Sequence, residues 1–457
     1  IRTPMNGVFG MTEILLRTEL DERQRRLVGT VQQSAKTLLT IINDILDISR
    51  IEAGKLELDS GRFDLRRCVE DAVAIFEEQT QSKNVELALF VSDDIPAFVT
   101  GDDVRLRQIL INLVGNAVKF TSEGEVSLRV TSVGRCDEQH MIRFEVRDTG
   151  MGIDPVIKNR LFTPFSQADT TISRQYGGTG LGLSISKSLV NMMGGQLRIE
   201  SALGQGTAIS FVLPIPGAEA PERIARPDLA ILRDKRILIV DDRATNREIV
   251  ASYLEESGVE TVAVDSGSAA LEALTRAAND AKPFSAAILD IVMPGMSGLD
   301  LANLIRRSPA LQGLPLAFLS SLSWKGDARI VRELGVQTML SKPIRRQELL
   351  QEVAHLLGGA ITQPQADSDV RKTARALFGA RVLVAEDNPV NVEVAREYLQ
   401  DFGCSVIVAT DGREAVEAVR AGCYDLIFMD LQMPNMDGLA ATGHIRAHQR
   451  AKSAWRT

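Results

Sequence analysis

The sequence lacks the features that define several specialised protein classes. Its four cysteines are scattered without the spacing of metal ligands, which argues against a disulfide framework or a zinc site and fits a reducing compartment. No uncharged apolar run approaches the ~18 residues that a membrane span needs. Lys and Arg number 52 against 60 Asp and Glu, so the net charge is −8, and no basic run stands out. We expect no nucleic-acid partner, because basic side chains must neutralise phosphates.

The remaining composition is that of a folded protein of several domains. Hydrophobic residues make up 44% and charged residues 25% of the 457 positions. At about 100–200 residues per domain, this length predicts roughly three to four domains. The sequence begins at Ile1 inside a helical pattern, and the pattern before Trp455 is not completed. We therefore expect an internal part of a longer protein.

An internal repeat dominates the C-terminal half. RILIVDDR at 236–243 returns as RVLVAEDN at 381–388, and ILDIVMPGMSGLD at 288–300 returns as IFMDLQMPNMDGL at 427–439. Each copy has an apolar strand that ends in acids, then an amphipathic helix and a further strand. This order predicts two copies of an α/β domain with a parallel sheet and helices on both faces.

The N-terminal half divides into a helical and a mixed segment. Apolar residues at helical spacing within 38–58, separated from an earlier helix by the charged run 21–26, predict a helical hairpin that dimerises as a four-helix bundle. Residues 62–213 alternate between strand-like and helix-like patterns of apolar residues. We predict strands at 86–91, 125–130, 141–148, 196–201 and 207–213, and helices at 64–82, 102–119 and 181–193.

Glycine-rich loops and a polar helix face carry the first candidate chemistry. DTGMG (148–152) follows a predicted strand and GGTGLGL (177–183) opens a helix, where free N–H groups can bind phosphate. Asn112 and Asn116 are four residues apart, so they share a helix face with Lys119, and such a face suits magnesium and phosphate oxygens. The alternatives are a polar helix face with capping asparagines, and glycine turns that are only structural.

These motifs, with LFTPF (161–165) and GQGTAISF (204–211), resemble the ATP-binding domain of sensor histidine kinases, of the superfamily shared with gyrase and Hsp90. The resemblance implies that Asp148 binds the adenine amino group and that Asn112 and Asn116 serve Mg²⁺ and phosphate. It implies roles for Phe162 and Phe165 in positioning the lid. The implied ATP-binding residues are Asn112, Asn116, Lys119, Asp148, Gly150, Gly152, Gly178, Gly180, Gly182 and Thr207.

The first residues, IRTPMNGVFG, resemble the segment that follows the phosphorylated histidine of the same family, whose motif runs Ser-His-Glu-Ile-Arg-Thr-Pro. Here that histidine would lie just upstream of Ile1. The resemblance implies a phosphatase role for Thr3, against the alternative of a helix-capping threonine. We expect the chain as given to bind Mg-ATP but not to autophosphorylate, because the nucleophilic imidazole is absent.

The repeated domains place acids at neighbouring strand ends. Because the carboxyl ends of parallel strands meet at one sheet edge, these carboxylates suit Mg²⁺; acidic helix caps are the alternative. The domains resemble response-regulator receivers of flavodoxin-like fold, which implies phosphoacceptors at Asp290 and Asp430 and a switch pair at Ser320 and Lys342. The implied magnesium ligands are Asp241, Asp242, Asp290, Glu386, Asp387 and Asp430. The second receiver is expected to be cut short and poorly stable.

Together the motifs are identified, by resemblance, as a hybrid sensor histidine kinase of a two-component phosphorelay, with ATP and Mg²⁺ as cofactors. The expected multidomain α and α/β order is dimerisation helices 1–58, ATP-binding domain 62–215, linker 216–234, receiver 235–358, linker 359–379 and receiver 380–457. The implied partners are a second copy, a phosphotransfer protein and a downstream regulator. We expect a cytoplasmic portion whose parent is anchored through an upstream region. A non-signalling ATPase and a catalytically inactive scaffold remain alternatives.

Overall fold

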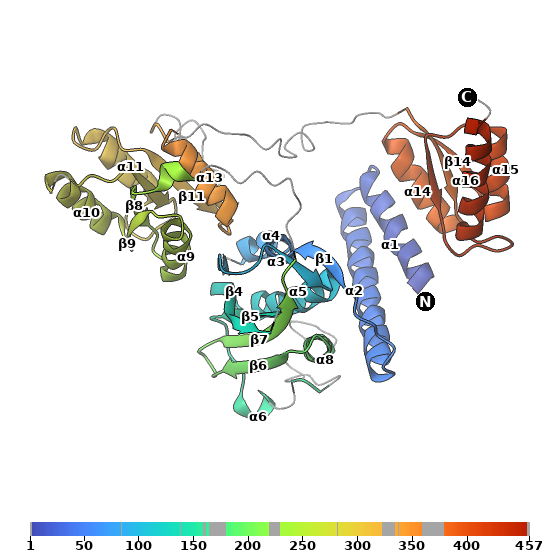
Figure 1. Cartoon of the computed structure of the whole chain (residues 1–457), viewed down its shortest axis with the longest axis horizontal. Coiled ribbons are helices and arrows are strands. Elements are labelled where there is room, and N and C mark those ends of the chain that lie inside the picture. The colour runs from blue at the N-terminus through green and yellow to red at the C-terminus, as the bar shows by residue number, and fades with distance from the viewer. Residues whose placement is uncertain are drawn as a thin grey trace. The chain divides into compact units, whose positions relative to one another are not determined.

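A computed structural model describes residues 2–83, 85–137, 139–158, 161–163, 180–218, 229–280, 282–321, 334–336, 338–358 and 379–454. The chain divides into two compact units (Figure 1). One unit comprises residues 1–46 and 363–457, and the other comprises residues 47–362. The boundary between the units falls inside one long helix.

The N-terminal segment is the predicted helical hairpin, formed by α1 (Arg2–Arg17) and α2 (Glu22–Glu52). Asp21 and Gln24 exchange backbone-to-side-chain hydrogen bonds of 2.7 and 3.0 Å, which fixes the start of α2. The predicted helix extended to residue 58, but α2 ends at Glu52 because Gly54 adopts a left-handed conformation with φ +62°. Apolar side chains on both helices are exposed: Val8, Met11, Leu15, Leu27, Val31, Leu38, Ile45 and Leu46.

The next domain is a five-stranded sheet in the order β2-β4-β5-β7-β6, with β2 and β4 parallel and the other neighbours antiparallel. Its elements are β1 (Gly61–Asp64), α3 (Leu65–Ala74), α4 (Glu77–Ser82), β2 (Val85–Val91), β3 (Phe98–Gly101), α5 (Asp103–Phe120), β4 (Gly124–Cys136), β5 (Gln139–Asp148), α6 (Pro155–Lys158), α8 (Gly182–Met192), β6 (Gln196–Ser201) and β7 (Thr207–Pro216). All five predicted strands are present, and a small pair, β1 and β3, was not predicted.

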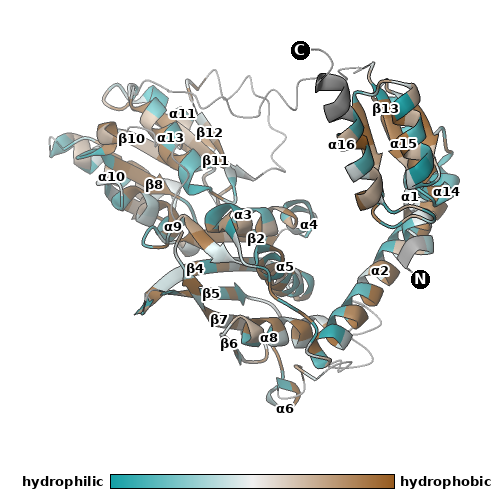
Figure 2. Ribbon diagram, turned by 45° about the vertical axis from the view of Figure 1, so that its right-hand side comes forward, coloured by the Kyte–Doolittle hydropathy of each residue, from teal (hydrophilic) through white to brown (hydrophobic). Residues whose placement is uncertain are grey.

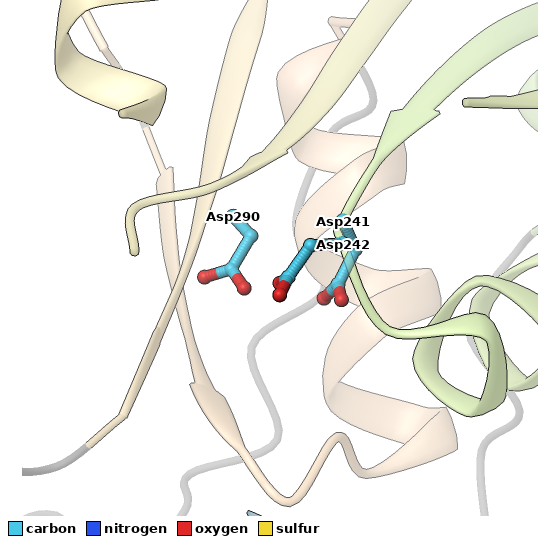
Figure 3. Close-up of side chains that lie close together, drawn as sticks. All are labelled: Asp241, Asp242 and Asp290. Atoms are coloured by element: carbon cyan, nitrogen blue, oxygen red, sulfur yellow. The ribbon is translucent and has the colours of Figure 1, made fainter. Parts of the chain in front are cut away.

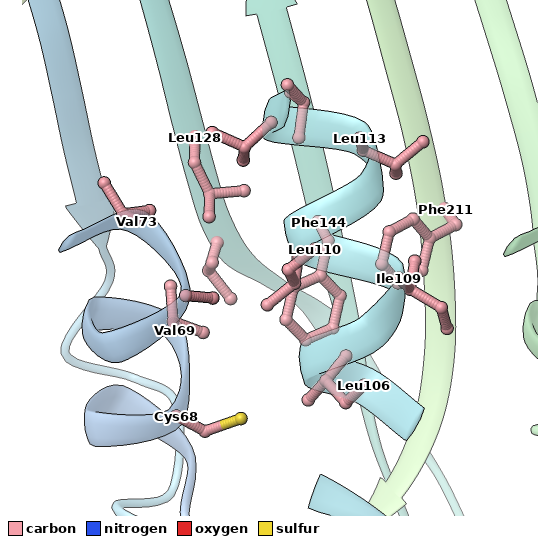
Figure 4. Close-up of a cluster of buried hydrophobic side chains, with 14 of the residues drawn as sticks. Cys68, Val69, Val73, Leu106, Ile109, Leu110, Leu113, Leu128, Phe144 and Phe211 are labelled. Atoms are coloured by element: carbon pink, nitrogen blue, oxygen red, sulfur yellow. The ribbon is translucent and has the colours of Figure 1, made fainter. Parts of the chain in front are cut away.

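The core of this domain lies between the sheet and its helices. Helix α5 buries Leu106, Ile109, Leu110 and Leu113, whose spacing forms one helical stripe. Figure 4 shows these side chains meeting those of α3 and of the strands beneath. The single helix predicted over 64–82 is instead two, α3 and α4. The chain turns at Phe76, whose ring lies against Gly115 of α5.

The first receiver is a five-stranded parallel sheet in the order β12-β11-β10-β8-β9. Its elements are η1 (Ala230–Leu232), β8 (Arg236–Val240), α9 (Ala244–Glu255), β9 (Glu260–Val264), α10 (Gly267–Asn279), β10 (Ala286–Asp290), α11 (Gly298–Arg307), β11 (Leu316–Ser321), β12 (Thr338–Lys342) and α13 (Arg346–Leu356). Helices cover both faces, so the central strands are buried on both sides and read as continuous apolar runs.

The second receiver has a three-stranded parallel sheet in the order β14-β13-β15. Its elements are β13 (Arg381–Ala385), α14 (Pro389–Asp401), β14 (Ser405–Ala409), α15 (Gly412–Ala421), β15 (Leu426–Met429) and α16 (Gly438–Ala454). Leu426 and Phe428 are each 49% exposed, whereas Ala286 and Ile288 at the matching positions of β10 are fully buried.

Helix α14 packs against α1 in the same unit. Gly7 and Gly10 of α1 lie directly against Val390 and Val394 of α14, where a larger residue would clash. Both helices show a mixture of apolar and polar residues along their length (Figure 2). Within the described residues, none of the helices combines the length and the apolar character that crossing a bilayer requires.

Candidate nucleotide and phosphoacceptor sites

The predicted polar face of α5 meets the start of α8. Asn116 donates through Nδ2 to Oδ1 of Asn112 at 3.4 Å, and Asn112 donates to Ser186 Oγ at 2.7 Å. Gly182 begins α8 directly against the Asn112 amide, so a Cβ at this position would collide with it. The free N–H groups at the start of α8 therefore lie beside two amide side chains, an arrangement suited to phosphate. The sequence analysis missed Ser186, which no motif marked.

Asp148 is the last residue of β5 and is followed by a tight turn. Its Oδ1 accepts from the Gly150 N–H at 2.9 Å, and its register partner across the sheet is Thr207. Burial raises the pKa of Asp148, although hydrogen bonds from the backbone of Gly150 and Thr207 oppose this. A Cβ on Gly150 would come to 2.5 Å from the Phe120 carbonyl oxygen, so the loop needs glycine there. A partly desolvated carboxylate that is held in this way can accept a hydrogen bond from an amino group.

The structure also describes other predicted nucleotide residues of this domain. Gly152 and Gly180 adopt left-handed conformations with φ +70° and +69°. The Thr207 hydroxyl lies 2.9 Å from Ser201 Oγ. Lys119 lies over the Phe120 ring at 4.9 Å, and burial lowers the pKa of its ammonium.

The described residues include only part of the predicted lid. The Phe162 ring lies 5.1 Å from Lys187 Nζ, a cation–π contact that joins the predicted lid segment to α8. Gly178 and Phe165 lie outside the described residues. Thr3 belongs to the first turn of α1, and its side chain is also outside them.

The first receiver brings Asp241, Asp242 and Asp290 together (Figure 3), with ligand oxygens within 4.8 Å of one another. The first two follow β8 and the third ends β10, so parallel pairing places them at one edge. Burial raises the pKa of Asp290 to about 6 and raises that of Asp241, despite the opposing charge of Lys342. Three hard oxygen donors at this spacing fit Mg²⁺.

Lys342 closes this site from β12. Its Nζ is 2.8 Å from Asp241 Oδ2 and 2.8 Å from Asp290 Oδ2. Burial alone would lower the pKa of Lys342, but the surrounding carboxylates more than reverse this and raise it. Ser320 is half-buried near the same end of β11, one residue before Ser321, which pairs with Lys342. The structure therefore brings the predicted acids, hydroxyl and lysine to one edge of the sheet.

Two residues of this site were missed by sequence reasoning. Asn246, in the first turn of α9 and four residues after Asp242, donates to Asp241 at 3.0 Å. Its counterpart Asn391 donates to Glu386 at 2.9 Å, so the repeat itself could have revealed both. Glu86 of β2 also reaches Lys342, at 3.0 Å. It belongs to another domain, and nothing in the sequence marked it.

The second receiver assembles the matching acids. Ligand oxygens of Glu386, Asp387 and Asp430 also lie within 4.8 Å of one another. They are more exposed than those of the first receiver, because the sheet has fewer strands around them. Their spacing equally fits Mg²⁺.

The loops after Asp290 and Asp430 have the same construction. Each passes through a left-handed residue, Gly295 with φ +77° or Asn435 with φ +62°. Each then closes through a glycine N–H onto the residue that follows the aspartate. Gly298 donates to the Ile291 carbonyl and Gly438 donates to that of Leu431, both at 3.1 Å.

Family models match most of the chain. The model of the His Kinase A (phospho-acceptor) domain matches residues 1–54, and that of the histidine kinase-, DNA gyrase B- and HSP90-like ATPase matches 101–217. The response regulator receiver domain matches twice, over 237–354 and 382–454.

Relatives match the same order of domains. The sensor protein GacS of Pseudomonas syringae pv. syringae is 36% identical over 99% of this chain and 49% of its own length. The signal transduction histidine-protein kinase BarA of Escherichia coli K12 is 34% identical over 96% of this chain and 46% of its own length. The chain thus spans about half the length of these curated relatives.

A solved structure agrees along almost the whole chain. Full-length ShkA, in complex with AMPPNP, has a TM-score of 0.64 and 32% identity over 97% of this chain and 88% of ShkA. A phosphoacceptor helix domain, an ATPase domain and two receivers in one polypeptide, together with these relatives, show that the chain belongs to the hybrid sensor histidine kinases.

Proposed function

We propose that this chain carries out the nucleotide-binding and relay steps of a phosphorelay. The γ-phosphoryl group of ATP passes to a histidine, and then to Asp290, to Asp430 or to both. The observation that carries the proposal is the presence, in one chain, of a half-buried carboxylate at Asp148, of two amides beside a helix N-terminus and of two acid clusters at receiver sheet edges.

In the nucleotide site, each residue has a separate role. Asp148 accepts from the adenine amino group, while its bonds from Gly150 and Thr207 hold it in place. Asn112 and Asn116 offer amide oxygens toward Mg²⁺ and phosphate, and the ion neutralises phosphate charge when bound. Lys119 and the start of α8 add positive potential. Gly150, Gly152, Gly180 and Gly182 leave room for the nucleotide, and Gly178 belongs to the lid segment.

In a receiver, the aspartate is the nucleophile. A carboxylate oxygen of Asp290 attacks the phosphorus of a phosphohistidine, the P–O bond forms, the P–N bond breaks, and the imidazole nitrogen leaves with a proton. Lys342 pairs with the charge that develops on the phosphoryl oxygens, and Ser320 turns toward them. Asp241 and Asp242, or Glu386 and Asp387 around Asp430, hold Mg²⁺.

Further parts of the proposal concern assembly and location. The exposed apolar side chains of α1 and α2 pack against a second copy. Thr3 orients the water that dephosphorylates a partner receiver. A phosphotransfer-domain protein and a response regulator receive the phosphoryl group downstream. The parent protein is anchored in a membrane through a region upstream of Ile1, with this portion in the cytoplasm.

Label transfer from γ-labelled ATP tests the proposal. We would compare the chain with one extended by Ser-His-Glu before Ile1, alone and with Asp148→Asn, Asp290→Asn or Asp430→Asn. The extended chain should gain base-stable histidine label and hydroxylamine-sensitive aspartyl label. Asp148→Asn should lose both labels. Asp290→Asn and Asp430→Asn should each keep the histidine label and lose the aspartyl label only at the residue replaced. ATP hydrolysis without protein label would favour the non-signalling ATPase, and failure to bind Mg-ATP would favour the scaffold.

A further inference from the structure

Strand β2 of the ATP-binding domain has two buried faces, although it lies at the edge of its sheet. Val85, Leu87, Leu89 and Val91 face the core of their own domain. The alternate residues face the first receiver. Ala88 is 2% exposed and packs in the apolar cluster of Ile249 and Tyr253. Phe90 stacks on the Tyr253 ring with 5.6 Å between centroids. One strand thus contributes to two cores.

Tyr253 of α9 also occupies the open edge of β2. Its hydroxyl accepts from the Val91 N–H at 3.0 Å and donates to the Leu89 carbonyl at 3.3 Å. These are main-chain groups that the edge of a sheet otherwise leaves unpaired. Ion pairs lie at the rim, between Arg129 and Glu248 at 2.8 Å and between Arg346 and Asp93 at 2.9 Å. The contact has an apolar centre and a charged rim, as specific interfaces do.

The same face of β2 carries Glu86 into the phosphoacceptor site. Its Oε1 is 3.0 Å from Lys342 Nζ, its Oε2 is 3.4 Å from Arg243 Nε, and Asn246 donates to it. The Lys342 ammonium therefore forms ion pairs with three carboxylates at once, those of Glu86, Asp241 and Asp290. Burial alone would raise the pKa of Glu86, but Lys342, Asn246 and Arg243 outweigh it and lower the pKa, so Glu86 is ionised here.

We propose that the first receiver docks on β2 through α9, and that Glu86 holds Lys342 in the docked state, so that docking and phosphorylation of Asp290 exclude each other. Phosphorylation replaces the single negative charge of the Asp290 carboxylate by close to two negative charges beside Glu86, and it recruits the lysine that Glu86 uses. Both effects repel the carboxylate of β2 and release the receiver from the ATP-binding domain. This inference rests on the proposed function only in taking Asp290 as the phosphoacceptor.

Hydrogen exchange tests the docking surface in the full chain, with no phosphodonor present. The Val91 amide should be protected in the unchanged chain. In Ala88→Arg it should exchange at least tenfold faster, because a charged side chain enters the apolar centre of the contact. Glu200→Arg is the matched control, since Glu200 is exposed on β6 at the opposite edge of the same sheet. Equal exchange in Ala88→Arg and the unchanged chain would overturn the docking.

Phosphorylation by phosphoramidate, in chains that carry Asp430→Asn, tests the exclusion. Asp290 oxygen attacks phosphorus, the P–N bond breaks and ammonia leaves. Glu86→Ala should take up phosphoryl roughly tenfold faster than the chain with Glu86, the effect of about one charge-assisted hydrogen bond. Glu200→Ala should match the chain with Glu86. After phosphorylation, the Val91 amide should lose its protection.

The outcomes separate the two proposals. Equal rates with and without Glu86, or a Val91 amide still protected when Asp290 is fully phosphorylated, would overturn the exclusion. Absence of label on Asp290 in every chain would overturn the proposed phosphoacceptor and the switch with it, whereas protection of Val91 that is lost in Ala88→Arg would still establish the docking surface.

Discussion

Replacing Lys342 by methionine should destabilise the first receiver strongly, and more so at high pH. The Lys342 side chain is only 10% exposed, and its ammonium lies 2.8–3.0 Å from three carboxylates, of Glu86, Asp241 and Asp290. Removing one partner of a buried ion pair costs about 3–5 kcal/mol, because an uncompensated charge remains. We expect a loss of this size at pH 8 without Mg²⁺. Lys282→Met, at an exposed position of the same domain, should change little.

The pH dependence follows from Asp290, whose pKa is already raised to about 6 with Lys342 present. A carboxyl that binds its proton more tightly in the folded state contributes stability below its unfolded pKa, and this is lost as pH rises through the folded pKa. Without Lys342 the folded pKa rises further. The cost of the substitution should therefore shrink as pH falls from 8 toward 5, and also on adding Mg²⁺.

Hydrogen exchange of β8 and β10 along a denaturant series in the full chain measures the local free energy of unfolding. A loss below 1 kcal/mol at pH 8 without Mg²⁺ would contradict the reasoning. So would a larger loss that stays the same between pH 5 and pH 8.

Three further predictions concern other sites. Asp148→Asn should weaken ATP binding by about tenfold to a hundredfold, the range of a charge-assisted hydrogen bond. In the unchanged chain, the ATP affinity measured by calorimetry should fall on acidification at a higher pH than an ordinary aspartate would cause, because the pKa of Asp148 is raised. An ATP affinity that does not depend on pH would count against this role of Asp148. Cys68 is buried with a pKa of about 12, so it should resist a thiol reagent at pH 8 that labels exposed Cys136, and equal labelling rates in peptide mapping would refute the burial. Residues 380–454 should unfold at a lower denaturant concentration than residues 235–358, because Leu426 and Phe428 are half exposed whereas the first receiver buries their counterparts. Each fully buried apolar side chain stabilises a fold by about 1.5–3 kcal/mol. Coincident unfolding transitions of the two domains in hydrogen exchange would contradict this prediction.

Sequence patterns predicted the strands and helices well where local periodicity was strong. β6 (Gln196–Ser201) has the predicted bounds, and β5 and β7 lie within a few residues of theirs. The errors have local physical causes. Gly54 ends α2 early through its left-handed backbone, and Phe76 breaks one predicted helix in two because its ring packs on α5. A pattern of apolar residues does not distinguish a helix that continues from one that turns to bury an aromatic ring.

The candidate sites were predictable where the residues recur in motifs. The repeat alone placed Asp290 and Asp430 at strand ends, and parallel pairing then gathers the acids. Ser186 and Glu86 could not be found in this way. Each reaches its site from an element far away in the sequence, through a contact that only the packing of α8 or β2 creates.

The loops after Asp290 and Asp430 show how little of the fold their shape requires. Each closes on itself through a left-handed residue and a returning glycine N–H, in a sheet of five strands and in a sheet of three alike. The aspartate is therefore aimed by the handful of residues that follow it. Such a loop is transplantable: moved as one piece onto another parallel strand, it should keep its geometry, while the strength of its chemistry would depend on the neighbours that the new sheet supplies.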